Sequence, residues 1–323
     1  MRRLRLSQQV IVVLIFLVMF AGFALFLPGF MSGLNMVALL QNVAILGILG
    51  LGMSLIVLGR GIDLSMVAML AVPPGLLLQM VQNGHSVPTA CVAAFGLALV
   101  FGLLNGWLIA YAEVPPLFTT LGSGIFLAGL GQAAFFQLDV VQWSSKLDTL
   151  SWFGRGTFLS VPMPLVMFAL ATGFTALFLK KAQLGTYIYA VGDNPFGART
   201  TGIPTRPVIV LQYVLAALFA AFAGMVMAAS VNSMPTRIYN STLIYDVILV
   251  VILGGIGLSG GRGSAVNVLI GTLFIGTLIN GMTILDVSYS AQNLVKGVVL
   301  LAALLIDSLL NPRNEETAQQ GDI

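Results

Sequence analysis

The chain has 323 residues, of which 58% are hydrophobic and only 8% are charged. A soluble globular domain carries about 25% charged residues, so this composition excludes one and indicates a polytopic membrane protein. The formal charge of +3 does not indicate nucleic-acid binding, because the basic residues are scattered and form no patch.

Two residue types that often build chemical sites occur once each. Cys91 is the only cysteine and His85 the only histidine of the chain. One cysteine excludes an internal disulfide and a thiolate metal cluster. A lone histidine in a short polar break is too few ligands for a metal, and we interpret it as solvated. We therefore expect no metal site and no cofactor.

Ten apolar stretches follow one another along the chain. A helix needs about 20 apolar residues to cross the hydrocarbon of a bilayer, and lipid offers no partners for unpaired backbone groups. The runs are too long and too uniform for the alternating strands of a membrane barrel. The sequence therefore predicts an all-α membrane protein with about ten transmembrane helices, at residues 8–27, 34–58, 64–82, 88–111, 117–137, 162–180, 207–230, 241–257, 264–285 and 290–310.

The positive charges predict the orientation. The first apolar run is longer than the core of a signal peptide, which spans about 7–15 residues, so we interpret it as a transmembrane helix. With the N-terminus inside, most basic residues fall on the inner side, as the positive-inside rule requires, and both chain ends are cytoplasmic. The inner group is Arg2, Arg3, Arg5, Arg60, Lys180, Lys181, Arg199, Arg206, Arg262 and Arg313, and the outer group is Lys146, Arg155 and Arg237.

Glycines and prolines mark particular helices. Gly102 and Gly106 form a G-x-x-x-G pattern, which lets helix backbones approach closely, and we expect this packing within the chain rather than between two chains. Pro73 and Pro74 lie inside the third stretch, where proline removes a donor and clashes with the preceding turn. We expect a broken helix there.

The segment 181–206 is polar, turn-rich and basic at both ends, whereas a mere connector needs only a few residues. Asn194 followed by Pro195 is a suitable helix start, with a side-chain cap and then proline in the first position. Gly202, with a proline two residues on, is a suitable stop. We expect a short helix over residues 195–201. The alternative is a solvated connector.

Charges near the transmembrane stretches usually have a role. We expect Asp63 to form a local ion pair with Arg60, and Asp246 to pair with Lys296 and lock two helices together. Contact with the substrate is the alternative for Asp63, and gating is the alternative for the pair of Asp246 and Lys296. Glu113 begins an inner turn, where we expect it to be solvated.

A solute path needs hydrogen-bonding groups between apolar and aromatic walls, at modest affinity because the solute must leave. Each such side chain can instead hydrogen-bond a neighbouring helix, which is the commoner use. We expect two or three of the intramembrane polar residues to line the path. The candidates are Gln41, Asn42, Asn105, Gln132, Gln212, Tyr213, Asn267 and Asn280.

The string GIGLSGGRGS, residues 255–264, is similar to the signature loop of the nucleotide-binding subunits of ATP-binding-cassette transporters. An ATP site also needs a phosphate-binding loop with the pattern G-x-x-x-x-G-K-[ST], which the sequence lacks. The string lies between two apolar stretches. We therefore interpret it as a tight cytoplasmic turn, with Arg262 as its positive anchor.

Several strings, in order, resemble the ribose-type permeases of bacterial monosaccharide importers that are driven by ATP-binding-cassette ATPases. One is DVILVVILGGIGLSGGRGS from Asp246, followed by the Asn-Gly at Asn280 and the Lys-Gly at Lys296. The others are GIDLS at residues 61–65, VPPLFTTLGS at 114–123 and LGTYIYAVGDNPFGARTTGI at 184–203. The chain departs from the family pattern after Ser65, where a small glycine is usual, and after Asn194, where an acidic residue is usual.

The resemblance implies a single transmembrane permease domain over residues 1–323, with the type II fold of the vitamin B12 importers, in the bacterial inner membrane. It also implies that residues 181–206 form a coupling loop, whose short helix seats in a groove of a cytoplasmic ATPase. Further implied partners are a second permease copy or a sister permease, an external sugar-binding protein and membrane lipid. The expected coupling residues are Asp193, Asn194, Pro195, Phe196, Arg199 and Gly202.

We therefore expect a non-enzymatic transport subunit that moves a monosaccharide or related polyol, with ATP hydrolysis in a separate subunit. The alternative is an ion-coupled secondary sugar transporter with Asp63 or Asp246 as its ion site. Clear repeats and a carboxylate at the midplane would favour it, but the acids lie toward span ends. A membrane enzyme fits least, because His, Cys, Asp and Glu form no cluster in the sequence.

Overall fold

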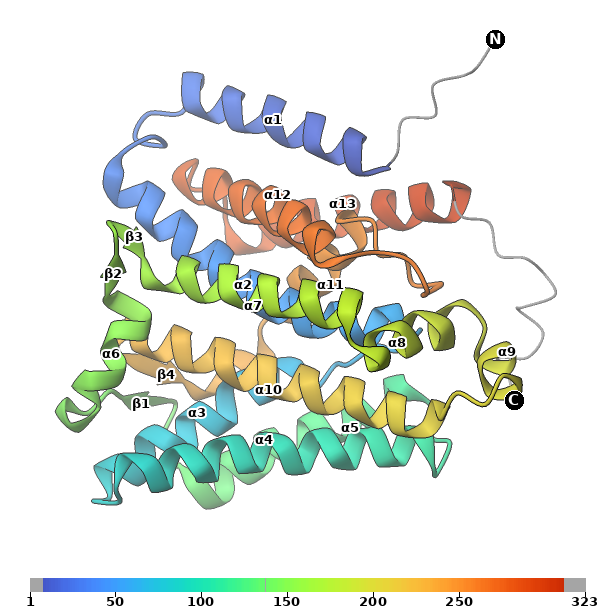
Figure 1. Ribbon diagram of the computed structural model, residues 1–323. Coiled ribbons are helices and arrows are strands. Elements are labelled where there is room, and N and C mark those ends of the chain that lie inside the picture. Colours follow the sequence, from blue (N-terminus) through green and yellow to red (C-terminus); the bar gives the residue numbers. More distant parts are fainter. Residues whose placement is uncertain (1–7, 137, 311–323) are drawn as a thin grey trace, which may run out of the picture.

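The computed structural model describes residues 8–136 and 138–310. Within them the chain is almost entirely helical, and long helices lie side by side in one bundle (Figure 1). The charges that the sequence analysis placed at Arg2, Arg3, Arg5 and Arg313, and with them both chain ends, lie outside the described residues.

Each of the ten predicted stretches corresponds to one apolar helix. Eight of the ten begin and end within two residues of the predicted limits, because the apolar runs end at polar or glycine-rich turns. The helices are α1 (Gln8–Phe26), α2 (Gly33–Leu58), α3 (Met66–Gln82), α4 (Val87–Ala110), α5 (Pro116–Leu130), α7 (Met163–Lys181), α10 (Thr205–Val231), α11 (Leu243–Leu253), α12 (Ala265–Ile284) and α13 (Tyr289–Leu310).

Two of these helices depart from the predicted limits. The helix α5 stops early and continues as a π-helical turn, Gly131–Phe135, and α11 has 11 residues. By length and composition, eight helices among the described residues can cross a membrane, and α3 and α11 are shorter apolar helices. The chain is therefore a multi-pass membrane protein with at least these eight candidate spans.

The short elements gather at the two ends of the bundle. At one end, the α6 end, lie β1 (Val140–Gln142), a 3-10 turn (Ser145–Leu147), α6 (Asp148–Arg155), β2 (Thr157–Phe158), β3 (Val161–Pro162), β4 (Ser233–Pro235) and a second 3-10 turn (Thr236–Asn240). The strands form two small antiparallel pairs, β1 with β4 and β2 with β3. At the other end, the α9 end, lie α8 (Gln183–Asp193) and α9 (Pro195–Thr200).

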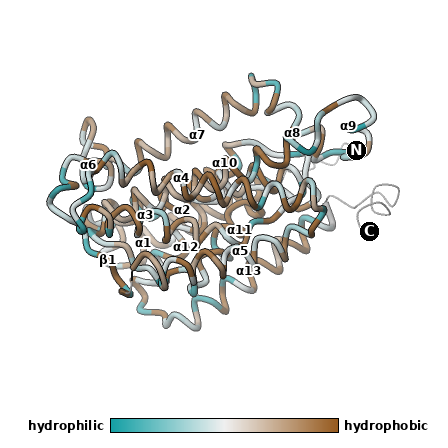
Figure 2. The backbone as a smooth tube through the Cα atoms, turned by 90° about the horizontal axis from the view of Figure 1, so that it is seen from below, coloured by the Kyte–Doolittle hydropathy of each residue, from teal (hydrophilic) through white to brown (hydrophobic). Residues whose placement is uncertain are grey.

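The second half of α2 forms the centre of the bundle. Almost every residue from Val43 to Leu58 is buried, against α10, α12, α7 and α11. Figure 2 shows hydrophobic residues along the bundle and hydrophilic ones mostly near its two ends. Large apolar side chains stay exposed on the outer helices, for example Leu25, Phe126 and Leu301. A surface of this kind is suited to lipid and not to water.

Glycines set the tightest helix contacts, as the sequence predicts for the G-x-x-x-G pair. A Cβ at Gly106 would lie 2.6 Å from the Cα of Val210, and one at Gly102 would lie 2.8 Å from the Cα of Val214. Both contacts join α4 to α10 within the chain. The expectation of packing within one chain is confirmed for these two glycines.

The expected break of α3 at its prolines is wrong. The helix runs through Pro73 and Pro74 without interruption, and both are buried. Because Pro74 has no N–H, the carbonyl oxygen of Leu70 loses its usual helical donor. Gly224 of α10 packs so closely there that an added Cβ would lie 1.9 Å from this oxygen. Close packing against α10 and α4 holds the helix together despite the hydrogen bonds that the two prolines remove.

Candidate functional site

The helix α9 is the most exposed regular element at its end of the bundle. The side chain of Asn194 accepts a hydrogen bond from the backbone N–H of Gly197 at 2.8 Å, and Pro195 is the first helical residue. Gly202, with a φ of 84°, follows the helix. The predicted start is therefore confirmed, and the helix ends one residue earlier than expected, at Thr200. Phe196 is 60% exposed, although it is a large apolar residue.

The sequence analysis did not predict α8, which leads into α9. Near its start, this helix packs closely on α7, because a Cβ at Gly185 would lie 2.3 Å from the carbonyl oxygen of Phe178. In its second half, the helix is held by Tyr189, whose hydroxyl donates to the carbonyl oxygen of Gly263 at 2.7 Å. Partial burial raises the pKa of Tyr189, which keeps this hydroxyl a donor.

Three turns meet beside the end of α8. We call them the three-turn junction: residues 58–61 after α2, residues 192–193 at the end of α8, and residues 260–263 before α12. The backbone N–H of Gly261 donates to the carbonyl oxygen of Leu58 at 2.8 Å. A Cβ at Gly192 would lie 1.7 Å from that same oxygen, so the contact requires glycine.

Arg60 fastens the junction from the side. Its Nε donates to the carbonyl oxygen of Gly192 at 2.6 Å, and its Nη2 donates to that of Asp193 at 2.5 Å. The last carbonyls of a helix lack partners within the helix and carry partial negative charge, which makes them good acceptors for a guanidinium. The ends of α2, α8 and α12 are thus tied together through backbone atoms.

The predicted ion pair between Arg60 and Asp63 is wrong. Asp63 instead accepts hydrogen bonds from the backbone N–H of Ser65 at 2.7 Å and from its hydroxyl at 2.5 Å. The Asp63 carboxylate therefore accepts from unpaired donors at the start of α3, while Arg60 donates to the carbonyl groups at the end of α8. Burial raises the pKa of Asp63 to about 6, against the two bonds from Ser65. Arg262, the expected anchor of its turn, is exposed on the junction's third turn.

A buried polar layer lies behind the junction. Asn105 donates to the hydroxyl of Ser65 at 3.1 Å, Gln212 donates to the carbonyl oxygen of Leu55 at 2.9 Å, and the Tyr213 hydroxyl donates to that of Ile62 at 3.3 Å. These three path candidates come from α4 and α10 and hold the end of α2 and the turn between α2 and α3. They therefore serve helix packing in this structure.

Three further path candidates also bond inside the protein. Gln132 donates to the Thr236 hydroxyl at 2.8 Å, Asn267 donates to the carbonyl oxygen of Gly254 at 2.6 Å, and Asn280 exchanges two bonds with Asn35 at 2.8 and 3.0 Å. The remaining two candidates lie next to each other on α2. Gln41 is half-buried and Asn42 is exposed.

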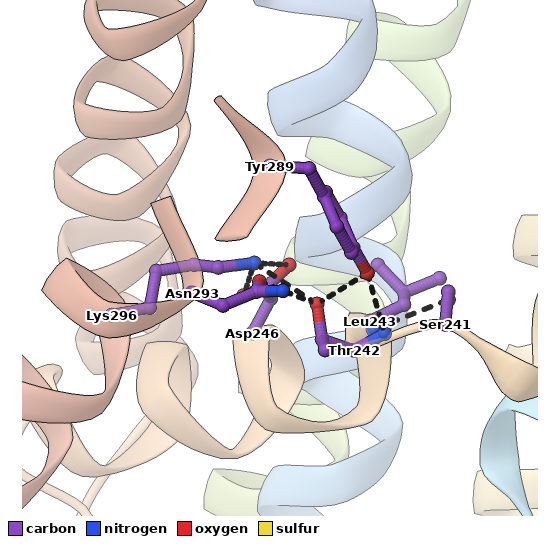
Figure 3. A network of polar contacts seen from close by, with 7 residues as sticks. All are labelled: Ser241, Thr242, Leu243, Asp246, Tyr289, Asn293 and Lys296. Carbon is purple, nitrogen blue, oxygen red and sulfur yellow. Dashed lines mark hydrogen bonds and ion pairs between the residues drawn. The ribbon is translucent and has the colours of Figure 1, made fainter. Parts of the chain in front are cut away.

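At the α6 end, the predicted pair of Asp246 and Lys296 is confirmed. The ammonium nitrogen lies 2.8 Å from Oδ1 and 3.1 Å from Oδ2 of the carboxylate, and both side chains are buried. Figure 3 shows the surrounding network, in which the Thr242 hydroxyl contacts Lys296, Tyr289 and Asn293. The network joins the start of α11 to α13, a helix that otherwise exposes much of its apolar surface.

Glu113 is exposed, as expected, but it also has a partner. Its carboxylate pairs with Arg206 at 2.9 Å, because the contact of α4 with α10 brings the turn after α4 next to the start of α10. Over the part of the chain that the structure describes, no three residues of the types His, Cys, Asp and Glu stand close enough to hold a metal ion.

A comparison with known proteins places the chain in a protein family. Residues 35–304 match the family described as branched-chain amino acid transport system, permease component. The ribose import permease protein RbsC of Bacillus subtilis is 36% identical over 87% of this chain and 86% of its own length. The galactofuranose transporter permease protein YtfT of Escherichia coli is 33% identical over 84% of this chain and 78% of its own length.

A third relative, the galactose/methyl galactoside import permease protein MglC of Escherichia coli, is 29% identical over 89% of this chain and 90% of its own length. No solved structure matches the chain. The names of the three relatives refer to sugar import or sugar transport, whereas the name of the family model refers to amino acid transport.

Proposed function

The chain belongs to this permease family, as a ribose-type member, and we propose that its exposed helix α9 receives the motion of a separate ATPase and drives sugar import. The chain is a permease subunit of an ATP-binding-cassette importer. Its cargo is a monosaccharide or a related polyol, in keeping with the sugars for which its relatives are named. It acts as a transport subunit and leaves ATP hydrolysis to its partner.

The proposed topology has ten spans, with α3 and α11 completing the eight longer helices. Both chain ends are then cytoplasmic, and the α9 end faces the cytoplasm with Arg60, Arg199, Arg206 and Arg262, in accord with the positive-inside rule. A short helix can end inside the bilayer where protein surrounds its backbone ends. We propose the type II permease fold, in the inner membrane, as a single domain over residues 1–323.

The contact with the ATPase is assigned to residues 193–202. The observation that carries this proposal is that α9 is exposed and yet rigidly held: Asn194 caps it, and α8 connects it to the three-turn junction. Phe196 supplies an apolar anchor and Arg199 a charged contact at the surface, a combination common at protein interfaces. Asp193 and Gly202 bound the segment.

The junction provides the mechanical route. When the ATPase closes and pushes α9, α8 moves as a unit, because its last carbonyls are held by Arg60. The displacement reaches α2 through the contact of Gly192 with Leu58, and α12 through Gly261 and Tyr189. The central helix of the bundle and one of its neighbours then change position together, which is the motion that alternating access requires.

The solute path is proposed to involve the exposed face of α2. Six of the eight candidate side chains already have partners within the chain, so Gln41 and Asn42 are the best remaining candidates. An amide exposed in the middle of an apolar helix needs water, solute or a partner, because lipid cannot bond it. A second permease copy or a sister permease completes the conduit, and an external sugar-binding protein delivers the cargo.

The alternative is an ion-coupled sugar transporter. The structure disfavours Asp246 as its ion site, because Lys296 already neutralises this carboxylate at 2.8 Å. Reconstitution in vesicles separates the two functions. Sugar uptake that requires enclosed ATP and an added ATPase supports the importer. Uptake driven by a proton or sodium gradient without ATP refutes it.

A further inference from the structure

A groove runs along the outside of the bundle between α4 and α10, which lie side by side in Figure 1. Gly102 and Gly106 bring the two backbones into contact, so larger side chains on both flanks stand apart and leave a hollow between them. Its volume is about 760 Å³. The walls are apolar, and among the lining residues are Val100, Leu103, Leu104, Trp107, Leu211 and Val214.

The groove is open to the surroundings of the bundle. Val100 is 59% exposed and Trp107 is 54% exposed, although both are apolar. Such a surface must be covered by lipid or by another apolar chain. The choice between these two occupants depends on what lies at the ends of the groove.

One end of the groove carries charges of both signs. Tyr111 lines this end, and the guanidinium carbon of Arg206 lies 5.5 Å from the centre of its ring. Arg206 also pairs with Glu113 at 2.9 Å, and the two side chains remain 42% and 72% exposed. Both can therefore contact a further charged group.

The backbone of Glu113 adopts an unusual conformation in the turn after α4. Its φ is 56°, a conformation that non-glycine residues adopt rarely and that costs about 1–3 kcal/mol. The ion pair of Glu113 with Arg206 joins this turn to the start of α10. Trp107 lies in the last turn of α4 and Tyr111 directly follows the helix, and aromatic residues of this kind prefer the depth of lipid head groups.

We propose that the groove between α4 and α10 is a binding site for one zwitterionic phospholipid. An acyl chain lies between the two helices, the phosphate contacts Arg206, and the ammonium of the head group contacts Glu113. An apolar trough that ends in one positive and one negative side chain matches an amphiphile with one phosphate and one amine. A helix from another subunit would fill the trough, but it would match this exposed ion pair only if it carried an acid and a base at the same spacing.

The test measures which lipids stay with the permease when it is purified in mild detergent from membranes that contain phosphatidylethanolamine and phosphatidylglycerol. Native mass spectrometry reports the number and type of lipids bound to each intact chain. The wild-type chain is expected to retain phosphatidylethanolamine over phosphatidylglycerol by about two- to fivefold, the effect of one exposed ion pair. Equal retention of the two lipids would overturn the proposal.

Two sets of variants locate the site. Leu211→Trp fills the groove and is expected to lower the number of retained lipids by one, whereas Leu170→Trp, on the exposed face of α7, leaves it unchanged. Arg206→Gln and Glu113→Gln are expected to abolish the preference between the two head groups. Arg237→Gln serves as their control, because it removes an exposed ion pair with Asp139 at the opposite end of the bundle.

Three further outcomes would overturn the proposal. They are unchanged lipid retention in Leu211→Trp, an unchanged lipid preference in both charge variants, and a permease dimer that dissociates in Leu211→Trp while the lipid count stays the same. The last result would assign the groove to a second copy of the chain. Transport is not part of the readout, so the proposed import function is tested separately.

Discussion

The two ends of the bundle hold their helices together by different physical means. At the α9 end, the three-turn junction joins α2, α8 and α12 through backbone carbonyl groups, which accept from the N–H of Gly261 and from the Arg60 side chain, and glycine permits the contacts. At the α6 end, the network around Lys296 joins α11 to α13 through side chains and a buried ion pair. Backbone contacts allow close approach and leave no room for substitution. An ion pair between side chains can be replaced by a matched pair of neutral groups.

The largest expected effect is that of Gly192→Ala. A Cβ at this position would lie 1.7 Å from the carbonyl oxygen of Leu58, which is backbone and cannot turn aside. We expect loss of the junction, with little folded permease in the membrane and no sugar uptake. Gly297→Ala is the control, since nothing lies within 4 Å of its Cβ position. Quantitative membrane immunoblots and uptake assays compare the two, and equal behaviour would contradict the role of the junction.

The second-largest effect is expected at the α6 end, for Lys296→Met. Removal of the ammonium leaves Asp246 buried and charged without its partner, which costs about 3–5 kcal/mol. We expect a strongly lowered melting temperature in detergent. The double variant Asp246→Leu with Lys296→Met should recover most of the loss, because neither charge then remains. A double variant as unstable as the single one would show that the network acts through more than its charges.

A third prediction uses the pH dependence of Asp63. Its pKa in the folded chain is about 6, above the ordinary 3.8, so folding favours the protonated acid. The resulting stability is complete below about pH 4 and is lost as the pH rises through 6. It amounts to about 3 kcal/mol by order of magnitude. Melting curves of the wild type and Asp63→Asn should therefore differ more at pH 7 than at pH 4, with the variant more stable at pH 7. A constant difference across this range would contradict the assignment.

The smallest effect on stability is expected for Asn194→Ala. Loss of the cap on α9 costs about 1 kcal/mol and acts only on this short helix. The melting temperature should hardly change, while the amide of Gly197 should exchange its hydrogen faster. Hydrogen exchange measured by mass spectrometry checks this, and Ser86→Ala at the start of α4 supplies a cap variant at the other end. Unchanged protection around residue 197 would show that the cap does not hold α9.

The sequence predicted much of the bundle, because length and apolarity determine where a chain can cross a membrane. It also predicted α9, since Asn194, Pro195 and Gly202 are local signals for a helix start and stop. The helix α8 was missed because residues 183–193 mix glycine, tyrosine and polar side chains and show no long apolar run. The continuity of α3 was missed because packing against Gly224 outweighs the local effect of two prolines.

The partners of polar side chains were the least predictable part of the site. The pair of Asp246 and Lys296 could be anticipated, because two opposite charges in apolar helices need each other. Arg60 donates to carbonyl groups 132 and 133 residues away and not to the nearby Asp63. This partner depends on how the three turns are arranged in the folded chain, which the sequence does not show. For the same reason, no local signal separated the amides that hold helices from Gln41 and Asn42.

The central claim is that α9 receives the motion of the ATPase, and the most direct test measures sugar uptake and ATP hydrolysis in the same vesicles. Phe196→Ala removes the exposed apolar anchor, and Phe158→Ala removes a similarly exposed phenylalanine at the opposite end. We expect Phe196→Ala to be inserted normally but to take up at least about tenfold less sugar for each ATP hydrolysed, because one interface anchor is lost. Uptake for each ATP equal to that of the wild type and of Phe158→Ala would contradict it.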